Sequence, residues 1–108
     1  MEVLEFTANS TSKKIGMFVS IWKRNNEGIT IPYSENDNFE TMNIHCNQHG
    51  QVGRFEFPKS ILLEKGIISS EKFRGKNGMR VYPSWVKPIV AQAITTQNWQ
   101  LAYFKIVI

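Results

Sequence analysis

Positively charged side chains that lie between glycines are the clearest candidate functional residues in this sequence. Four cations fall in the segment 71–80, and Gly75 and Gly78 lie between them. Glycine lets a backbone approach a phosphate closely, and spaced cations neutralise successive phosphates. A solvated surface loop has the same composition, so both interpretations stand. The four cations are Lys72, Arg74, Lys76 and Arg80.

A second group of cations flanks an apolar stretch near the N-terminus. Lys13 and Lys14 precede the stretch, and Trp22 follows it together with Lys23 and Arg24. An indole beside two cations can stack on a nucleobase, although a tryptophan in a strand is often simply part of the core. The two lysines can equally be ordinary surface charge.

The overall charge favours an anionic partner. Thirteen Lys and Arg residues against nine Asp and Glu residues give a net charge of +4, and the pI is about 9.4. DNA or RNA is the expected partner, with Lys59 joining the two groups of cations on phosphates and Trp22 or Trp85 stacking on a base. This hypothesis requires the cations to converge on one side of a sheet.

Two carboxylates and a lysine offer an alternative, because metal-dependent nucleases gather such groups at strand ends around Mg²⁺. Glu40, Glu56 and Lys59 are the candidates, on segments that read as a hairpin. Ordinary cross-strand and surface charge explains the same residues. Mg²⁺ is therefore expected only if the nuclease alternative holds, and otherwise no cofactor is expected.

The sequence His45-Cys46-x-x-His49 has the spacing at which a zinc site can begin. The chain has two histidines and one cysteine in total, so a second ligand pair is missing. We therefore expect a strand residue and a turn here, and no metal site. A single cysteine also excludes an internal disulfide, which fits a cytoplasmic protein.

These residues are placed on the elements of one α+β domain spanning 1–108. The pattern predicts a mixed, mostly antiparallel sheet of about five or six strands with two helices, beginning with an antiparallel meander. The expected strands are 2–8, 15–24, 29–31, 39–46, 52–57 and 79–82, and the expected helices are 60–65 and a segment from about 90 onward.

Several boundaries follow from single residues. Pro58 should end a strand and open a helix, and Gly66 should stop that helix in a left-handed conformation. The segment 15–24 is apolar on both faces, which predicts a central strand covered on each side. In the last helix, Val90, Ile94 and Leu101 fall on one apolar stripe. The segment 106–108 reads as an extra strand or a docked tail.

The N-terminus has no basic region followed by an apolar run, so no signal peptide is expected. No apolar stretch approaches the length of about 20 residues that a membrane helix requires. We expect no membrane partner.

Four blocks of sequence, in this order along the chain, resemble the MepB family of bacterial proteins. The blocks are Lys13-Lys14-Ile15-Gly16-x-Phe18-Val19-x-x-Trp22-Lys23-Arg24, then Gly53-x-Phe55-x-Phe57-Pro58-Lys59-Ser60-x-Leu62-x-Glu64-Lys65-Gly66-Ile67, then Arg80-Val81-Tyr82-Pro83, then Gln97-x-Trp99-Gln100-x-x-Tyr103-Phe104. Together they cover nearly the whole chain.

The resemblance implies a small cytoplasmic protein with a core like that of restriction-endonuclease-like proteins and a role in binding nucleic acid. Some members are encoded beside a multidrug efflux pump and its repressor. This chain lacks the further N-terminal helical stretch usual in the family, which suggests a shortened form. A lysine common in the family is replaced by Asn9, which could not supply its charge to a nuclease-like site, and a proline is replaced by Ser12.

A third hypothesis is a protein-interaction module serving the efflux or stress system, with the region of Trp85 as its apolar contact.

Overall fold

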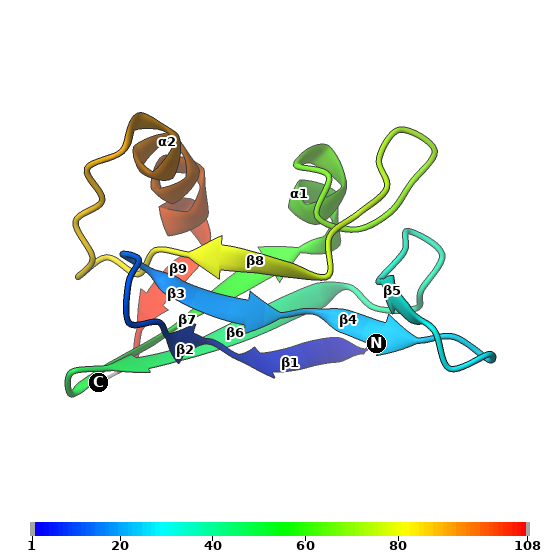
Figure 1. Ribbon diagram of the computed structural model, residues 1–108, viewed down its shortest axis with the longest axis horizontal. Coiled ribbons are helices and arrows are strands. Elements are labelled where there is room, and N and C mark those ends of the chain that lie inside the picture. The colour runs from blue at the N-terminus through cyan, green and yellow to red at the C-terminus, as the bar shows by residue number, and fades with distance from the viewer. Residues whose placement is uncertain (1, 108) are drawn as a thin grey trace.

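This computed structural model describes residues 2–107. Within that range the chain forms nine strands, two α-helices and one short 3₁₀ turn, which are joined by loops (Figure 1). The strands are β1 (Val3–Thr7), β2 (Asn9–Ser10), β3 (Met17–Ser20), β4 (Trp22–Arg24), β5 (Thr30–Pro32), β6 (Thr41–Gln48), β7 (Gln51–Pro58), β8 (Gly78–Val81) and β9 (Phe104–Ile106). The helices are α1 (Lys59–Glu64) and α2 (Ala91–Gln100), and the 3₁₀ turn η1 (Leu101–Tyr103) follows α2 directly.

The hairpin of β6 and β7 is the longest pairing in the molecule and forms the centre of a four-stranded sheet in the order β1-β6-β7-β9. The two strands pair along their whole lengths, from Thr41 opposite Pro58 to Gln48 opposite Gln51. His49 and Gly50 form the turn, with φ values of 54° and 80°. Two consecutive positive φ values match the right-handed twist of the flanking strands. The predicted hairpin is therefore confirmed.

The first strand departs from the predicted antiparallel meander. β1 pairs with β6 in parallel, with Val3 opposite Thr41 and Thr7 opposite His45. Parallel neighbours require a long crossover connection, and here the chain forms β2, β3, β4 and β5 before it returns as β6. A local reading of the sequence could not reveal a partner so distant along the chain.

The segment 15–24 is not one central strand covered on both faces, as the sequence predicted. It forms β3, the middle strand of a three-stranded sheet ordered β2-β3-β8, and then β4, which pairs with β5. Burial alternates along it: Met17, Val19 and Ile21 are buried, whereas Phe18 and Trp22 are exposed. Only one face therefore meets the core, and two aromatic rings face solvent.

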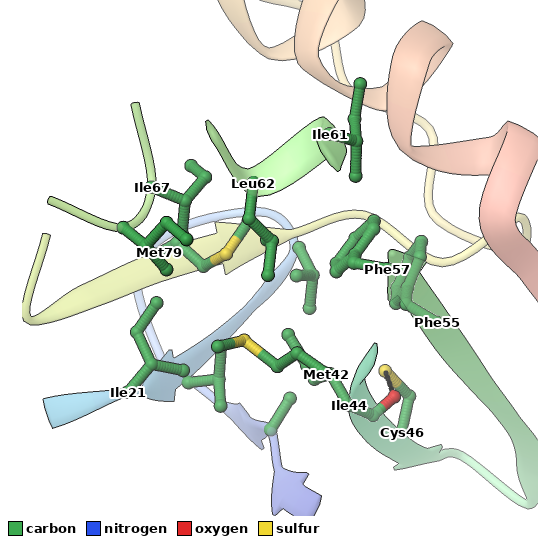
Figure 2. Close-up of a cluster of buried hydrophobic side chains, with 14 of the residues drawn as sticks. Ile21, Met42, Ile44, Cys46, Phe55, Phe57, Ile61, Leu62, Ile67 and Met79 are labelled. Carbon is green, nitrogen blue, oxygen red and sulfur yellow. Dashed lines mark hydrogen bonds between the residues drawn. The ribbon is translucent and has the colours of Figure 1, made fainter. Parts of the chain in front are cut away.

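The core lies between these sheets and α1, as Figure 2 shows. Alternate residues of each long strand point into it, as the period of a strand requires. Phe55 and Phe57 stack with ring centroids 5.3 Å apart, and both rings are fully buried. The labelled core residues are Ile21, Met42, Ile44, Cys46, Phe55, Phe57, Ile61, Leu62, Ile67 and Met79.

The start and the stop of α1 follow the prediction. Pro58 is the last residue of β7 and the N-cap of α1. Gly66 has a φ of 68°, the left-handed conformation that glycine adopts without strain. The N–H of Ile67 donates to the carbonyl of Leu62 at 2.9 Å, and that of Gly66 to the carbonyl of Leu63 at 3.2 Å. This pair of bonds is the Schellman motif, which satisfies carbonyls left free at a helix end.

Helix α2 docks through glutamines, and the predicted apolar stripe is wrong. Val90 and Ile94 are exposed, whereas Gln100 is completely buried. Its amide accepts a hydrogen bond from the N–H of Tyr82 at 2.9 Å and donates one to the carbonyl of Arg80 at 3.0 Å. Gln97 donates to the carbonyl of Val86 at 2.9 Å. The helix therefore binds backbone groups at the end of β8 and in the segment after it, a role that hydrophobic periodicity does not detect.

The α+β class, with its mixed and mostly antiparallel pairing and two helices, is confirmed. Within the described residues the strands number nine rather than five or six, because β2 and β9 are short and 15–24 forms two strands. The predicted extra strand at 106–108 is confirmed only at Ile106, the last residue of β9, which pairs with β7; Val107 donates its N–H to the carbonyl of Val52 at 2.8 Å. Ile108 lies outside the described residues. None of the helices described is long and apolar enough to span a membrane.

Candidate nucleic-acid interface

An exposed face of β3, β4 and β8 brings aromatic rings and guanidinium groups together. We call it the aromatic face, and it comprises Phe18, Ser20, Trp22, Arg24, Gly78 and Arg80. Alternation places the even-numbered residues of β3 and β4 on this side, because their odd-numbered neighbours Met17, Val19 and Ile21 fill the core. The face is therefore a consequence of the same pattern that builds the core.

Strand β8 contributes the remaining surface by antiparallel pairing with β3. Arg80 lies opposite Phe18, and Gly78 lies opposite Ser20. The ring of Phe18 covers Gly78 so closely that a Cβ on that residue would lie 2.4 Å from the ring. Glycine is the residue that accommodates this approach. The Phe18 ring therefore extends over β8 toward the position opposite Ser20.

Each aromatic ring on this face has a guanidinium beside it. The Arg24 guanidinium carbon lies 5.1 Å from the Trp22 ring centroid, and that of Arg80 lies 5.9 Å from the Phe18 centroid. Arg24 also donates to the carbonyl of Gly28 at 3.1 Å. Arg80 donates to the hydroxyl of Thr11 at 3.0 Å. These bonds orient the cations, and within residues 2–107 neither arginine forms an ion pair with a carboxylate.

Lys13 and Lys14 extend this basic surface beyond the end of β3. Both are exposed, in the loop that joins β2 to β3. They border a pocket together with Arg80, so one arginine belongs to both the aromatic face and the pocket. The structure thus brings together five of the ten residues predicted from the sequence: Lys13, Lys14, Trp22, Arg24 and Arg80.

Two other predicted cations are engaged elsewhere. Lys23 lies on the opposite side of β4 from Trp22 and forms an ion pair with Asp37. Lys59 donates to the backbone carbonyl of Asp37 at 2.6 Å, and its ammonium lies 4.9 Å from the centroid of the Phe39 ring. Both lysines therefore help to hold the segment before β6, and the expectation of a single convergent surface is wrong for them.

The loop between α1 and β8 forms a separate region. Lys72 borders a hollow that is also lined by Glu35, Glu64 and Glu71, so acids surround this cation. Arg74 and Lys76 are exposed on the same loop. Acids beside a cation weaken the local positive potential. This loop is therefore a poorer candidate for a polyanion than the aromatic face.

Within residues 2–107 the side chains of the nuclease candidates do not gather into a metal site, although the N–H of Lys59 donates to the carbonyl of Glu40 at 2.8 Å. Glu56 accepts from Arg54 at 2.6 Å, and Lys105 lies 3.0 Å from its other oxygen, on the face of the four-stranded sheet opposite the core. These hydrogen bonds, that of Arg54 first, hold the pKa of Glu56 below its ordinary value. Glu40 is exposed, and the side chain of Lys59 bonds to Asp37 as described above. Because both oxygens of Glu56 already have cationic partners, these residues do not fit a Mg²⁺ site, and we derive no cleavage step.

The segment 45–49 has no arrangement for a metal. Each of its three candidate ligands has a different environment: Nε2 of His45 lies 2.7 Å from Glu5, Cys46 is buried, and His49 is at the hairpin turn. Burial raises the pKa of the Cys46 thiol to about 12. Among residues 2–107, no group of three or more His, Cys, Asp or Glu side chains could hold a metal ion.

Trp85, which the sequence suggested as a stacking group or an apolar contact, is partly buried. Its ring packs against Phe104 with centroids 5.6 Å apart, and its indole N–H donates to Gln48 at 2.9 Å. Phe18, in contrast, was not singled out as a site residue. The signal that could have found it is the alternation Phe18-Ser20-Trp22, read as an exposed face rather than as a second buried one.

An α+β domain that presents an aromatic and basic strand face is the class of protein that this geometry defines. A family model described as MepB-like matches residues 2–105. The chain belongs to the MepB-like family.

A solved structure titled "Crystal Structure of MepB" is similar over 97% of this chain and 70% of that chain, with 32% sequence identity and a TM-score of 0.93. A search among curated proteins found no match.

Proposed function

We propose that this chain binds single-stranded DNA or RNA along the aromatic face. Bases stack on Phe18 and Trp22, and the neighbouring cations contact phosphates. The observation that carries the proposal is the pair of exposed aromatic rings on one strand face, each with a guanidinium beside it. Aromatic side chains on a sheet, combined with a positive surface, bind single strands with little dependence on sequence.

The exposure of the two rings supports this role. Phe18 is 40% exposed and Trp22 is 38% exposed, whereas the core-facing residues of β3 are essentially fully buried. Large aromatic residues lose favourable burial when they face water, so a pair of them on one surface often marks a binding site. The two residues are four positions apart in the sequence, which corresponds to about 13 Å along extended backbone. Ser20 lies between them on the same side, and the Phe18 ring covers Gly78 on the neighbouring strand.

Stacking requires unpaired bases, so we expect single strands to bind more tightly than duplexes of the same sequence. The proposal agrees with the cytoplasmic location expected from the sequence, which stays a prediction.

The test is fluorescence anisotropy with labelled single strands of DNA and RNA and with the matching duplex. Removing one stacking ring costs about 1–3 kcal/mol per base. Trp22→Ala and Phe18→Ala should therefore each weaken binding by about 5-fold to 150-fold, and Trp22→Phe should restore part of the loss. Intrinsic tryptophan fluorescence should be quenched on binding in the wild type and less so in Trp22→Phe.

Two matched controls separate this surface from general effects. Ile106→Ala removes an exposed apolar side chain from β9, and Lys65→Gln removes one charge from the end of α1. Both should leave affinity within about twofold of the wild type, because neither residue is on the aromatic face. The proposal would be refuted if the controls lost as much affinity as Trp22→Ala. It would also be refuted if the wild-type protein bound none of the three nucleic acids at low salt.

A further inference from the structure

An open pocket of about 430 Å³ lies at one end of the aromatic face. It is bordered by the loop between β2 and β3, the end of β8 and the start of α2, which gather at the same end of the molecule in Figure 1. We call it the β8–α2 pocket. Its volume falls within the range of small-molecule sites, which is about 300–1,000 Å³.

Three cations from two separate segments border this pocket: Lys13, Lys14 and Arg80. No acidic residue is among its described lining residues, and in the range 2–107 none of the three cations forms an ion pair. Arg80 is positioned by the hydroxyl of Thr11 and by the carbonyl of Ile15 at 3.4 Å, both bound to one terminal nitrogen. The rest of its guanidinium is left for a ligand.

The pocket also has an apolar wall. Ile15, Ile89 and Val90 line it and are 45%, 81% and 64% exposed. Large aliphatic residues exposed beside three cations fit a ligand with both a charged group and an apolar part. The first turn of α2 adds to the positive potential, since no side chain described here caps its start at Val90.

The amount of positive charge points to a particular group. An internal phosphodiester carries one negative charge, whereas a phosphate monoester carries about −1.5 to −2 at neutral pH. Three cations without carboxylate partners match the monoester better. A phosphate monoester occurs at the phosphorylated end of a nucleic acid strand, where the face of the terminal base can pack on the aliphatic side chains.

The pocket is continuous with the aromatic face through Arg80. This residue borders the pocket, and its guanidinium also lies 5.9 Å from the centroid of Phe18. A strand that stacks on Trp22 and Phe18 would reach the β8–α2 pocket at its end. We infer that this pocket binds the terminal phosphate monoester of the single strand held on the aromatic face, an inference that rests on the function proposed above.

The experiment is a competition assay against an internally labelled single strand. The unlabelled competitors share one sequence and carry a 5′-phosphate, a 3′-phosphate or hydroxyl groups at both ends. One phosphorylated form should bind about tenfold more tightly than the hydroxyl form, the change that one charge-assisted hydrogen bond supplies. The preferred end also gives the direction in which the strand runs.

Two variants test whether the preference comes from the pocket. The double variant Lys13→Gln with Lys14→Gln should reduce the preference to near unity, because it weakens binding of the phosphorylated form more than that of the hydroxyl form. Ile89→Asp places a negative charge at the wall on a side chain that is 81% exposed, so it should abolish the preference without affecting folding. The double variant Lys65→Gln with Lys72→Gln removes the same charge near α1 and should retain the preference.

The outcomes separate the two proposals. Wild-type protein that binds all three competitors equally overturns the pocket inference and leaves the proposed function standing. A preference that persists in both Ile89→Asp and the Lys13/Lys14 double variant also overturns it. If none of the three strands binds, both proposals fail together.

Discussion

Gln100 shows how one buried amide can fix a helix. Its side chain satisfies the N–H of Tyr82 and the carbonyl of Arg80 in a site closed to water. Gln100→Leu would leave both backbone groups unpaired, and each such group costs about 1–3 kcal/mol. We expect the free energy of unfolding, measured by urea denaturation, to fall by about 3 kcal/mol. Gln92→Leu is the same change at an exposed position of α2 and should alter stability by less than about 0.5 kcal/mol. Equal effects would show that the amide does not hold the helix.

Glu56 predicts a dependence of stability on pH. Its pKa is lowered in the folded protein by hydrogen bonds from Arg54 and Lys105. A carboxyl whose folded pKa is below its unfolded value, about 4.3, stabilises the protein above that value and loses the contribution as the pH falls through the folded pKa. The stability difference between wild type and Glu56→Gln should therefore be largest at neutral pH and shrink below about pH 4.

The measurement for Glu56 is a series of urea denaturation curves from neutral to acidic pH. Glu27→Gln, in the exposed turn between β4 and β5, is the control for the loss of one negative charge. A difference for Glu56→Gln that stayed constant or grew in acid would contradict the assigned ion pairs.

At the scale of elements, the stop of α1 combines a backbone requirement with a packing one. Gly66 has a φ of 68°, and a Cβ there would lie 2.9 Å from the ring of Phe73. Gly28 has a φ of 79° and open space around the same position. Gly28→Ala should cost about 1 kcal/mol for the left-handed backbone, and Gly66→Ala should cost about 1–2 kcal/mol more. Thermal unfolding of the two variants measures the difference, and equal melting temperatures would refute it.

The elements that the sequence predicted well are those whose signals are local. Pro58 and Gly66 bound α1, and the turn at His49 and Gly50 defines a hairpin, because each depends on the conformation of one or two residues. The parallel pairing of β1 and the polar docking of α2 depend on partners far along the chain. Periodicity reports which residues are apolar, so it assigned the exposed Val90 to the core and overlooked Gln100.

The candidate interface could be predicted only in part for a related reason. Composition identified the cations, but which side of a strand each occupies depends on which face is buried. Trp22 and Lys23 are neighbours in sequence and lie on opposite faces of β4. Asp37, which binds Lys23, comes from a loop whose position the sequence did not define.

For the molecule as a whole, the distribution of charge predicts the salt dependence of binding. The aromatic face and the β8–α2 pocket carry four cations, Lys13, Lys14, Arg24 and Arg80, whereas acids border the loop near Lys72. On single strands the logarithm of the binding constant falls by about 0.7 for each phosphate contacted, per unit of log salt concentration. Three or four contacts give a slope of about −2 to −3. Titrations across a salt series measure it, and a slope near zero would exclude phosphate contacts.

The parallel pairing of β1 with β6 also has a kinetic consequence. The β6–β7 hairpin closes through a turn at neighbouring residues, so it can form early. β1 has no strand partner until the chain up to His45 is available. During synthesis β1 therefore stays unpaired until β6 has been made, and its backbone groups can pair with other chains. We expect the nascent protein to be most prone to aggregation before β6 is available.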